Sequence, residues 1–396
     1  MKVQTDQTIE ELKTLGHIGF DPRTGTTRVA YSDAFYEGRE YVKRCMENAG
    51  LKTRIDSVGN LFGRLEGKSE KTILVGSHID TVPGGGMYDG ALGVFAGIEL
   101  IKRITREEYD GYYSIEIVAW NEEEGNAVGG TFGSRCFVGE EITPHERMNL
   151  RQFGLTEADA ENAKADAGKY VLYFELHIEQ GGSLEKEGLQ IGIVEGIVGI
   201  VRYHAQVIGE SNHAGSTPMS LRNDAMETSC KIICDLMQTV RETSPEMVTT
   251  VGLFDIPGGA VNVIPGRTEF VIEMRNKNIP EMKSVMAALQ ARYAQNKFEP
   301  ALFLEQAETS LDPDLTDIIE SICQEERYSY KRMFSGAGHD AMNTAKIIPT
   351  AMAFIPSIAG VSHCIRERSS DEDVRIGFDL TEKLICKMNG RVGHDN

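Results

Sequence analysis

Apolar and polar positions alternate in two ways along the first 195 residues. Short runs rich in β-branched and aromatic residues are typical of buried strands, and the stretches between them repeat apolar residues at helical spacing. This alternation predicts an α/β layer fold with a largely parallel sheet. The predicted strands of this segment cover 72–76, 114–120 and 170–174, and a fourth such run lies at 350–355. The predicted helices cover 32–48, with Ser32 as cap, and 90–106.

The pattern changes after about Gly199. A four-stranded sheet with two helices on one face fits the middle segment. Its predicted strands cover 200–209, 248–254, 261–264 and 268–274, and its helices cover 221–241 and 281–297. After Leu311 the pattern returns to helix, strand and helix, and the last helix covers 371–388 behind Ser369 and Ser370. We therefore expect a discontinuous α/β domain over 1–199 and 311–396, with a smaller α+β domain inserted at 200–310.

Composition and charge narrow the possible partners. The 396 residues are 41% hydrophobic and 26% charged, which is ordinary for a globular protein. The formal net charge of −19 argues against nucleic acid or an anionic membrane as partner, and an anionic substrate would need a local cation. The seven cysteines lack CxxC spacing, so free thiols are expected. The N-terminus has no apolar signal core and the longest apolar stretch, 91–101, is too short to span a bilayer, so we expect a cytoplasmic protein.

Residues with metal-ligand chemistry follow the predicted strands. His78 ends the first strand segment and Asp89 follows eleven residues later; Asp80 is placed to orient the His78 ring. A run of acids, Glu122–Glu124, follows the second strand, and adjacent carboxylates can bind a metal and move a proton separately. Taken alone, His78 fits a buried structural histidine and the acidic run fits a solvated surface.

Two further groups complete the set. Glu175 and His177 follow the third strand, and His363 follows the fourth. Because ligand crevices of open α/β sheets lie at the carboxyl ends of strands, four such groups predict one site at one sheet edge. The other histidines lack this setting and are expected to be structural or surface residues: His17, His145, His204 and His394.

The order of these motifs carries a resemblance to a known family. The chain resembles the amidase/hydantoinase/carbamoylase branch of the M20 metallopeptidase family, which contains N-carbamoyl-L-amino acid hydrolases, allantoate amidohydrolases and β-ureidopropionases. The resemblance covers most of the chain and rests on HIDTVPGGGMYDG, NEEEG, ELHIEQG, NHAGSTPM, VNVIPG and SGAGHDAM. It implies a zinc-exopeptidase-type α/β domain with an inserted lid domain that dimerises.

The resemblance also implies two divalent metal ions per subunit, which could be Zn, Mn, Co or Ni. Asp89 would bridge them, with His78 and His177 on one ion and Glu124 and His363 on the other. The M20 peptidases usually have an acidic ligand where this chain has His177. The ELHIEQG form therefore favours the carbamoylase side.

Catalytic and carboxylate-binding roles follow from the same resemblance. Glu123 corresponds to the general base. Asn262 and Arg275, thirteen residues apart on a predicted strand pair, would hold the substrate carboxylate. His213 resembles the lid residue that reaches the reacting carbonyl, often from the partner subunit. Without the resemblance, these residues fit a turn asparagine, an arginine on a solvated strand and a loop histidine.

The remaining pocket residues have a plainer alternative. Gln180 resembles a pocket-lining group, as do Gly336, Ala337, Gly338 and His339, where glycines would let main-chain N–H groups approach a substrate. A glycine turn with a structural histidine fits the same segment.

These observations predict an amidohydrolase with two metal ions that cleaves the carbamoyl or ureido C–N bond of a small carboxylate substrate. An N-carbamoyl-L-amino acid is the first expectation, with ammonia and carbon dioxide as further products. Allantoate amidohydrolase, β-ureidopropionase, an M20 dipeptidase or N-acyl amino acid deacylase, and a non-catalytic binding protein are the alternatives. Two segments near the expected pocket depart from the family pattern, 126–130 and 364–368.

Overall fold

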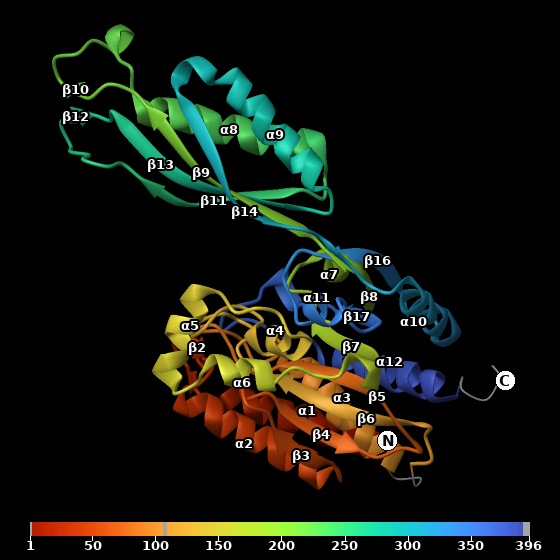
Figure 1. Cartoon of the computed structure of the whole chain (residues 1–396). Coiled ribbons are helices and arrows are strands. Elements are labelled where there is room, and N and C mark those ends of the chain that lie inside the picture. Colours follow the sequence, from red (N-terminus) through yellow and green to blue (C-terminus); the bar gives the residue numbers. More distant parts are fainter. Residues whose placement is uncertain (1, 106–108, 391–396) are drawn as a thin grey trace. The chain divides into compact units, whose positions relative to one another are not determined.

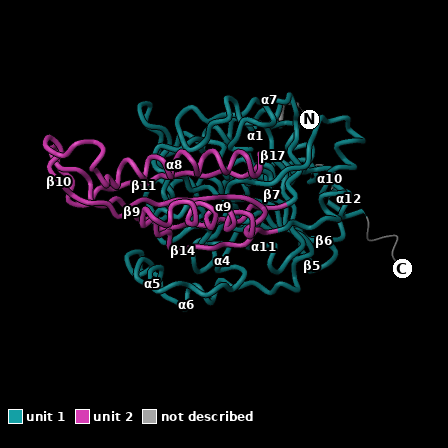
Figure 2. Tube along the Cα trace, turned by 90° about the horizontal axis from the view of Figure 1, so that it is seen from above, with its two compact units in different colours: residues 1–195, 310–396 teal, residues 196–309 magenta. Residues whose placement is uncertain are grey.

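The computed structural model describes residues 2–105 and 109–390, which form two units (Figure 2). Unit 1 comprises Met1–Glu195 and Ser310–Asn396, and unit 2 comprises Gly196–Thr309. The sequence placed these boundaries after residues 199 and 310. Of the expectations made from sequence, the helix end at Arg106 and the histidine at 394 lie outside the described residues.

Unit 1 is built on a nine-stranded sheet with the strand order β15-β8-β17-β7-β5-β6-β4-β3, and β16 pairs with β8. The four central strands β17, β7, β5 and β6 run parallel, and antiparallel strands flank them. The strand bounds are β3 (Lys52–Ile55), β4 (Leu61–Leu65), β5 (Ser69–His78), β6 (Tyr113–Trp120), β7 (Tyr170–Ile178), β8 (Ile191–Ile197), β15 (Thr309–Ser310), β16 (Tyr330–Ser335) and β17 (Thr350–Ile355). The parallel arrangement predicted from the apolar runs is confirmed for these four central strands, which are buried on both faces, but the sheet as a whole is mixed.

Five long helices cover this sheet (Figure 1). They are α1 (Lys2–His17), α2 (Asp33–Asn48), α3 (Ala91–Ile104), α10 (Pro313–Glu326) and α12 (Asp371–Gly390). Helix α3 is buried on nearly all sides, and it packs against β5, β6, β7, α1 and α12. Ser32 caps α2 as expected, because its Oγ accepts a hydrogen bond from the Phe35 N–H at 3.2 Å.

The shorter elements of unit 1 lie in its loops. They are β1 (Phe20–Asp21), β2 (Gly25–Thr26), α4 (Phe132–Val138), α5 (Pro144–Leu150), α6 (Glu157–Asn162), α7 (Ser183–Glu187) and α11 (Ala341–Thr344), with 3-10 turns at Arg151–Phe153, Ala167–Lys169 and Ile358–Gly360.

Unit 2 is an antiparallel sheet with the order β11-β13-β9-β14 and two helices on one face (Figure 1). Burial alternates along β9 and β13, as expected when one face packs under helices and the other stays open. Its elements are β9 (Gly199–Ile208), β10 (Asn212–His213), α8 (Ala225–Thr243), β11 (Val248–Asp255), β12 (Val263–Ile264), β13 (Arg267–Asn276), α9 (Ile279–Arg292) and β14 (Phe298–Gln306), with 3-10 turns at Met219–Leu221 and Ala294–Asn296.

One strand of unit 2 was predicted in the wrong place. The segment 261–264 contributes only the two-residue strand β12, which pairs with β10 outside the four-stranded sheet. The fourth strand is β14, in a segment where no strand was predicted. Pro300 weakens the strand signal there, and proline is tolerated because β14 is an edge strand.

Two smaller expectations concern the whole chain. All seven cysteines are free thiols, as predicted from their spacing. Within the described residues, no helix is both long enough and apolar enough to cross a membrane.

Candidate metal centre

The parallel strands bring the predicted ligand groups to one edge of the sheet. His78 is the last residue of β5 and lies opposite Trp120, the last residue of the neighbouring strand β6. His177 lies near the end of β7, opposite Phe354 of β17. The loops that follow β5, β6 and β17 carry the remaining candidates, so strand register alone assembles most of the site.

The Asp89 carboxylate lies between three imidazoles. Its Oδ1 is 3.5 Å from His78 Nε2 and 3.2 Å from His177 Nε2, and its Oδ2 is 3.3 Å from His363 Nε2. His363 Nε2 is also 3.6 Å from Glu124 Oε1. Two ligands of a tetrahedral ion with bonds of about 2.0–2.1 Å stand about 3.3 Å apart. These separations therefore fit a carboxylate with one oxygen for each of two ions, and two groups that could hold an ion share Asp89.

Main-chain contacts turn two of the imidazoles toward this centre. His78 Nδ1 lies 3.1 Å from the carbonyl oxygen of Asp80, and His177 Nδ1 lies 2.9 Å from that of Ile178. A carbonyl oxygen only accepts hydrogen bonds, so Nδ1 carries the proton in each ring and Nε2 lies on the side of Asp89. The Nε2 of His177 also accepts a hydrogen bond from the Gly90 N–H at 3.1 Å. This tautomer is the one that binds a metal ion through Nε2.

The Asp80 carboxylate holds the acidic loop rather than the ring. It accepts hydrogen bonds from the N–H of Glu123 at 3.2 Å and of Glu124 at 3.1 Å, while its oxygen is 3.6 Å from His78 Nδ1. Asp80 thus connects the loop after β5 with the loop after β6. Glu123 Oε2 lies 3.7 Å from His78 Nε2, beside the centre.

The first acid of the run has a separate task. Glu122 Oε1 accepts hydrogen bonds from the N–H groups of Ala127, Val128 and Gly129 at 2.5–3.2 Å. The segment 126–130, which departs from the family pattern, is therefore held by Glu122. The acidic run divides into one loop anchor and two residues at the metal centre.

The electrostatics of the group favour a bound cation. Burial raises the pKa of Glu123 well above its usual range. Burial and then the Asp89 charge raise the pKa of Glu124 to about 7. Burial opposes ionisation of Asp89 too, but the contacts with the imidazoles of His177, His363 and His78 hold its pKa well below the usual range. The Asp89 hydrogen bond raises the pKa of His363 to about 9. So many buried carboxylates are costly unless cations pair with them, and the donor set suits divalent ions.

Strained backbone gathers at the same place. Glu122, Gln180 and His363 all have φ between 54° and 61°, a region that non-glycine residues rarely adopt. Gln180 Nε2 donates to Asp89 Oδ2 at 2.7 Å, so this predicted pocket residue contacts the central carboxylate. Strain of this kind clusters at functional sites.

The predicted glycine-rich segment, 336–339, lies beside the centre, with a buried histidine and exposed glycines. His339 is buried, and its ring packs against that of His177 at 4.5 Å between centroids. Burial and then the His177 charge hold the pKa of His339 well below its usual range. The Ala337 N–H donates to Ser335 Oγ at 3.1 Å, and the two glycines that flank Ala337 are exposed.

Unit 2 brings two of its three candidates together. His213 is paired with Val263 across β10 and β12, and the carbonyl of Asn262 accepts a hydrogen bond from the Ala214 N–H at 3.0 Å. The His213 Nδ1 accepts from the Gly215 N–H at 3.0 Å. Its Nε2 therefore carries the proton and can act as a donor.

Arg275 lies apart from this pair. It pairs with Ile200 near the end of β13, whereas Asn262 precedes Arg267 at the start of that strand. Eight residues of strand span about 26 Å. The two residues expected to share one carboxylate are thus at opposite ends of β13. The Arg275 Nε donates to Glu273 Oε1 at 2.8 Å.

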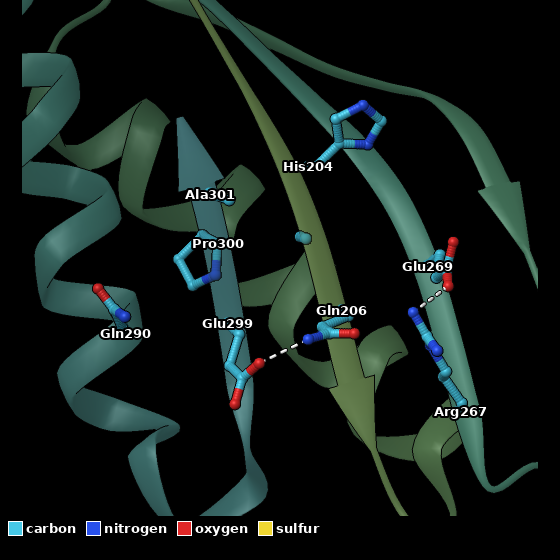
Figure 3. A pocket seen from close by; sticks show the side chains of 9 residues that line it. His204, Gln206, Arg267, Glu269, Gln290, Glu299, Pro300 and Ala301 are labelled. Carbon is cyan, nitrogen blue, oxygen red and sulfur yellow. Dashed lines mark hydrogen bonds and ion pairs between the residues drawn. The ribbon is translucent and has the colours of Figure 1, made fainter. Parts of the chain in front are cut away.

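A hollow beside strands β9, β13 and β14 of unit 2 is not a convincing ligand site. Figure 3 shows this cavity of about 370 Å³. Gln206 donates to Glu299 at 2.5 Å, and Arg267 pairs with Glu269 at 2.5 Å, so four of its polar side chains are already paired with one another. His204 on this face is exposed, as are His17 and His145, in keeping with the expected surface role.

Sequence reasoning missed two residues of the centre, Glu367 and Ser362. The Glu367 carboxylate accepts hydrogen bonds from the N–H groups of Asp89 and His363 at 3.1 and 3.3 Å. The Ser362 Oγ lies 2.8 Å from Asp89 Oδ2. The available signal was an acid four residues after His363, inside the segment 364–368 that departs from the family pattern.

Comparison with known proteins decides the family. The profile of peptidase family M20/M25/M40 matches residues 74–387. The chain belongs to this family. It is 35% identical over 407 residues to an N-carbamoyl-L-amino acid amidohydrolase of Geobacillus stearothermophilus, covering 98% of this chain and 99% of that one. It is 35% identical over 404 residues to an allantoate amidohydrolase of Escherichia coli K12, covering 96% and 98%.

The solved structures agree with these relatives. An amidase of the hydantoinase/carbamoylase family from Burkholderia multivorans superposes with a TM-score of 0.86 at 29% identity, over 97% of both chains. The resemblance and the two-domain α/β fold class inferred from sequence are confirmed. Family membership makes the chain a hydrolase that acts on C–N amide bonds.

Proposed function

We propose that this chain hydrolyses the carbamoyl C–N bond of an N-carbamoyl-L-amino acid, with two divalent ions held by His78, Asp89, Glu124, His177 and His363. The observation that carries the proposal is the Asp89 carboxylate, which directs one oxygen to two imidazoles and the other to a third. Bound there, divalent ions supply Lewis acidity that polarises the substrate carbonyl and activates water.

Glu123 is the proposed general base. Its carboxylate is largely buried beside His78, and the hydrogen bond from its own N–H to Asp80 fixes the loop that carries it. Glu123 takes a proton from the attacking water as the new C–O bond forms at the carbamoyl carbon. It then passes this proton to the departing nitrogen as the C–N bond breaks. The released carbamic acid decomposes to ammonia and carbon dioxide.

Substrate binding is assigned to both units. Arg275 holds the substrate carboxylate with its planar guanidinium, and the Nε2–H of His213 donates to the carbonyl oxygen, where negative charge develops. Gln180 and the segment 336–339 line the pocket of unit 1. The contact between Gln180 and Asp89 supports the first of these assignments.

A homodimer through unit 2 would bring Asn262 and Arg275 together from two different copies, although within one chain they lie at opposite ends of β13. Because Asn262 and Arg275 of one chain lie at opposite ends of that strand, we propose that Asn262 and His213 of one copy act with Arg275 of the other. Large apolar side chains exposed on both edge strands support pairing between copies. They are Val248 and Leu253 on β11, at 55% and 68% exposed, and Leu302 and Phe303 on β14, at 41% and 50%.

Allantoate is the second candidate substrate. The allantoate amidohydrolase relative is as similar to this chain as the carbamoyl amino acid relative, at 35% identity each. Both substrates combine a carboxylate with a ureido group, so the same residues would serve. A β-ureidopropionate, an N-acyl amino acid or a dipeptide would keep the metal chemistry and change only the pocket.

The test is a metal-reconstitution assay. Protein stripped of metal is reloaded with Zn, Mn, Co or Ni, and ammonia release is measured from N-carbamoyl-L-amino acids, allantoate and β-ureidopropionate, with a dipeptide as control. Metal-dependent ammonia from the carbamoyl amino acid is the expected result. Cleavage of the dipeptide alone would replace the proposal with a peptidase activity, and ammonia from allantoate alone would change the substrate.

A further inference from the structure

One buried carboxylate joins two loops that carry metal-ligand candidates. Glu367 is 3% exposed and its Oε1 accepts hydrogen bonds from the N–H groups of Tyr88 and Asp89, at 3.0 and 3.1 Å. Its Oε2 accepts from the Ser362 hydroxyl at 2.6 Å and from the His363 N–H at 3.3 Å. Asp89 and His363 are far apart in sequence, and Glu367 connects their backbones directly.

The hydrogen bonds of Glu367 argue against a role as a further metal ligand. A carboxylate has about four acceptor positions, and here each oxygen already accepts two donors. Glu367 is therefore not a further metal ligand.

Two neighbouring features show that the connection is built closely. His363 has φ of 54°, and its N–H in this uncommon conformation donates to Glu367. On the other loop, a Cβ added to Gly86 would come within 2.0 Å of Glu367 Oε1, so only glycine leaves room for the carboxylate. The Ser362 Oγ lies 2.6 Å from Glu367 Oε2 and 2.8 Å from Asp89 Oδ2, and its single proton can be donated to either of the two carboxylates.

We propose that Glu367 is a positioning residue that fixes the spacing between the Asp89 loop and the His363 loop, and thereby sets the affinity of the ion held by Asp89, Glu124 and His363. This inference rests on the two-ion site of the proposed function. The His363 loop carries a single ligand for that ion, and its position depends on Glu367. The His78 and His177 side of the site is fixed by strands β5 and β7, so the other ion depends on Glu367 less.

The test is metal titration of Glu367→Gln in the full-length protein. A glutamine amide has one acceptor oxygen and one NH₂ donor, so either orientation leaves one loop without its acceptor. Wild-type and variant proteins stripped of metal are titrated with Mn²⁺ by calorimetry and with Co²⁺ by visible absorption. We expect one binding step to weaken by about 10- to 100-fold and the other to change much less.

A matched control is Glu99→Gln. Glu99 is fully buried on α3 and accepts hydrogen bonds from Thr5, Thr8 and Arg103 at 2.6–2.7 Å. It lies on α3, eight residues after the first residue Ala91, or about 12 Å along the helix axis from the end that follows Asp89. This variant should lose stability and keep both metal steps. Equal weakening of metal binding in Glu99→Gln and Glu367→Gln would overturn the proposal, as would unchanged metal steps in folded Glu367→Gln.

If Glu367→Gln does not fold, two milder variants test the positioning role of Glu367. Ser362→Ala removes one of the four hydrogen bonds and should weaken the same step several-fold, and Gly86→Ala should act like it by displacing the carboxylate. Unchanged metal steps in both would refute the proposal.

Measurements of turnover distinguish a failure of this inference from a failure of the proposed function. The activity of Glu367→Gln on the carbamoyl amino acid should fall at limiting metal and recover with excess metal, with KM unchanged. A wild-type enzyme that binds two ions and cleaves no ureido substrate would remove the proposed function alone, since the titrations would still report on Glu367. A wild-type protein that binds a single ion would overturn both.

Discussion

The candidate residues of the two units are held in different ways. In unit 1, Asp89 and His177 are 4% and 0% exposed, and their partners come from loops and strands far apart in sequence. In unit 2, His213 and Asn262 are exposed, and their hydrogen bonds reach only short-range or adjacent-strand neighbours. The candidate metal ligands are therefore preorganised inside unit 1, while His213 and Asn262 of unit 2 lie on an open surface.

The largest effect is expected for the base of unit 1. Glu123→Gln keeps the size of the side chain and removes its ability to accept a proton. We expect kcat to fall by about 10²- to 10⁴-fold, because that is the usual contribution of general acid–base catalysis. The measurement is steady-state ammonia release, with metal content determined on the same sample. Near-normal kcat in a variant with both ions would remove Glu123 from this role.

The sequence was informative where strand ends decide positions. The carboxyl ends of parallel strands predicted that the groups around His78, Glu124, His177 and His363 meet at one edge, and the resemblance selected the five ligands. The structure places His78, Asp89 and His177 in one group that could hold an ion, and Asp89, Glu124 and His363 in another. That inference did not depend on contacts between residues of the same strand or loop.

The sequence was less informative where distant segments meet. Glu367 joins loops more than 270 residues apart, and no local pattern reports such a contact. The resemblance implied that Asn262 and Arg275 share one carboxylate, but the chain between them runs along the extended strand β13 and carries the two apart. Strand β14 was missed because an edge strand tolerates Pro300, which the pattern counts against a strand.

A smaller effect is expected for the donor of unit 2. His213→Ala should lower kcat by about 10²- to 10³-fold if its Nε2–H stabilises the developing oxyanion. His204→Ala is the matched control, since His204 is also an exposed histidine of unit 2 and has no assigned role. Both variants are compared by kcat at saturating substrate. Equal kcat values for the two would place His213 outside the reaction.

The carboxylate clamp should affect binding more than turnover. Arg275→Ala removes charge-assisted hydrogen bonds worth about 1.5–3 kcal/mol, so KM for the carbamoyl amino acid should rise by about 10- to 100-fold. Arg275→Lys keeps the charge and loses the bidentate geometry, so an intermediate KM is expected. An unchanged KM in Arg275→Ala would show that another cation binds the carboxylate.

The smallest effects test whether the two units are also separate in folding. Asp224 caps α8 in unit 2 by accepting hydrogen bonds from the N–H groups of Met226 and Glu227 at 2.8 and 3.2 Å. Ser32 caps α2 in unit 1. Replacing either cap with alanine should lower the free energy of unfolding by about 1 kcal/mol.

The fluorescence of the single tryptophan distinguishes unfolding of unit 1 from unfolding of unit 2. Trp120 is fully buried in β6 of unit 1, so its fluorescence reports the unfolding of that unit, whereas far-ultraviolet circular dichroism reports both. Ser32→Ala should shift the fluorescence midpoint in urea, and Asp224→Ala should shift only the dichroism signal and leave Mn²⁺ affinity unchanged. A fluorescence midpoint that moves equally in both variants would mean that the units unfold as one cooperative body. The stability of the buried metal centre would then depend on the open unit that carries His213 and Arg275.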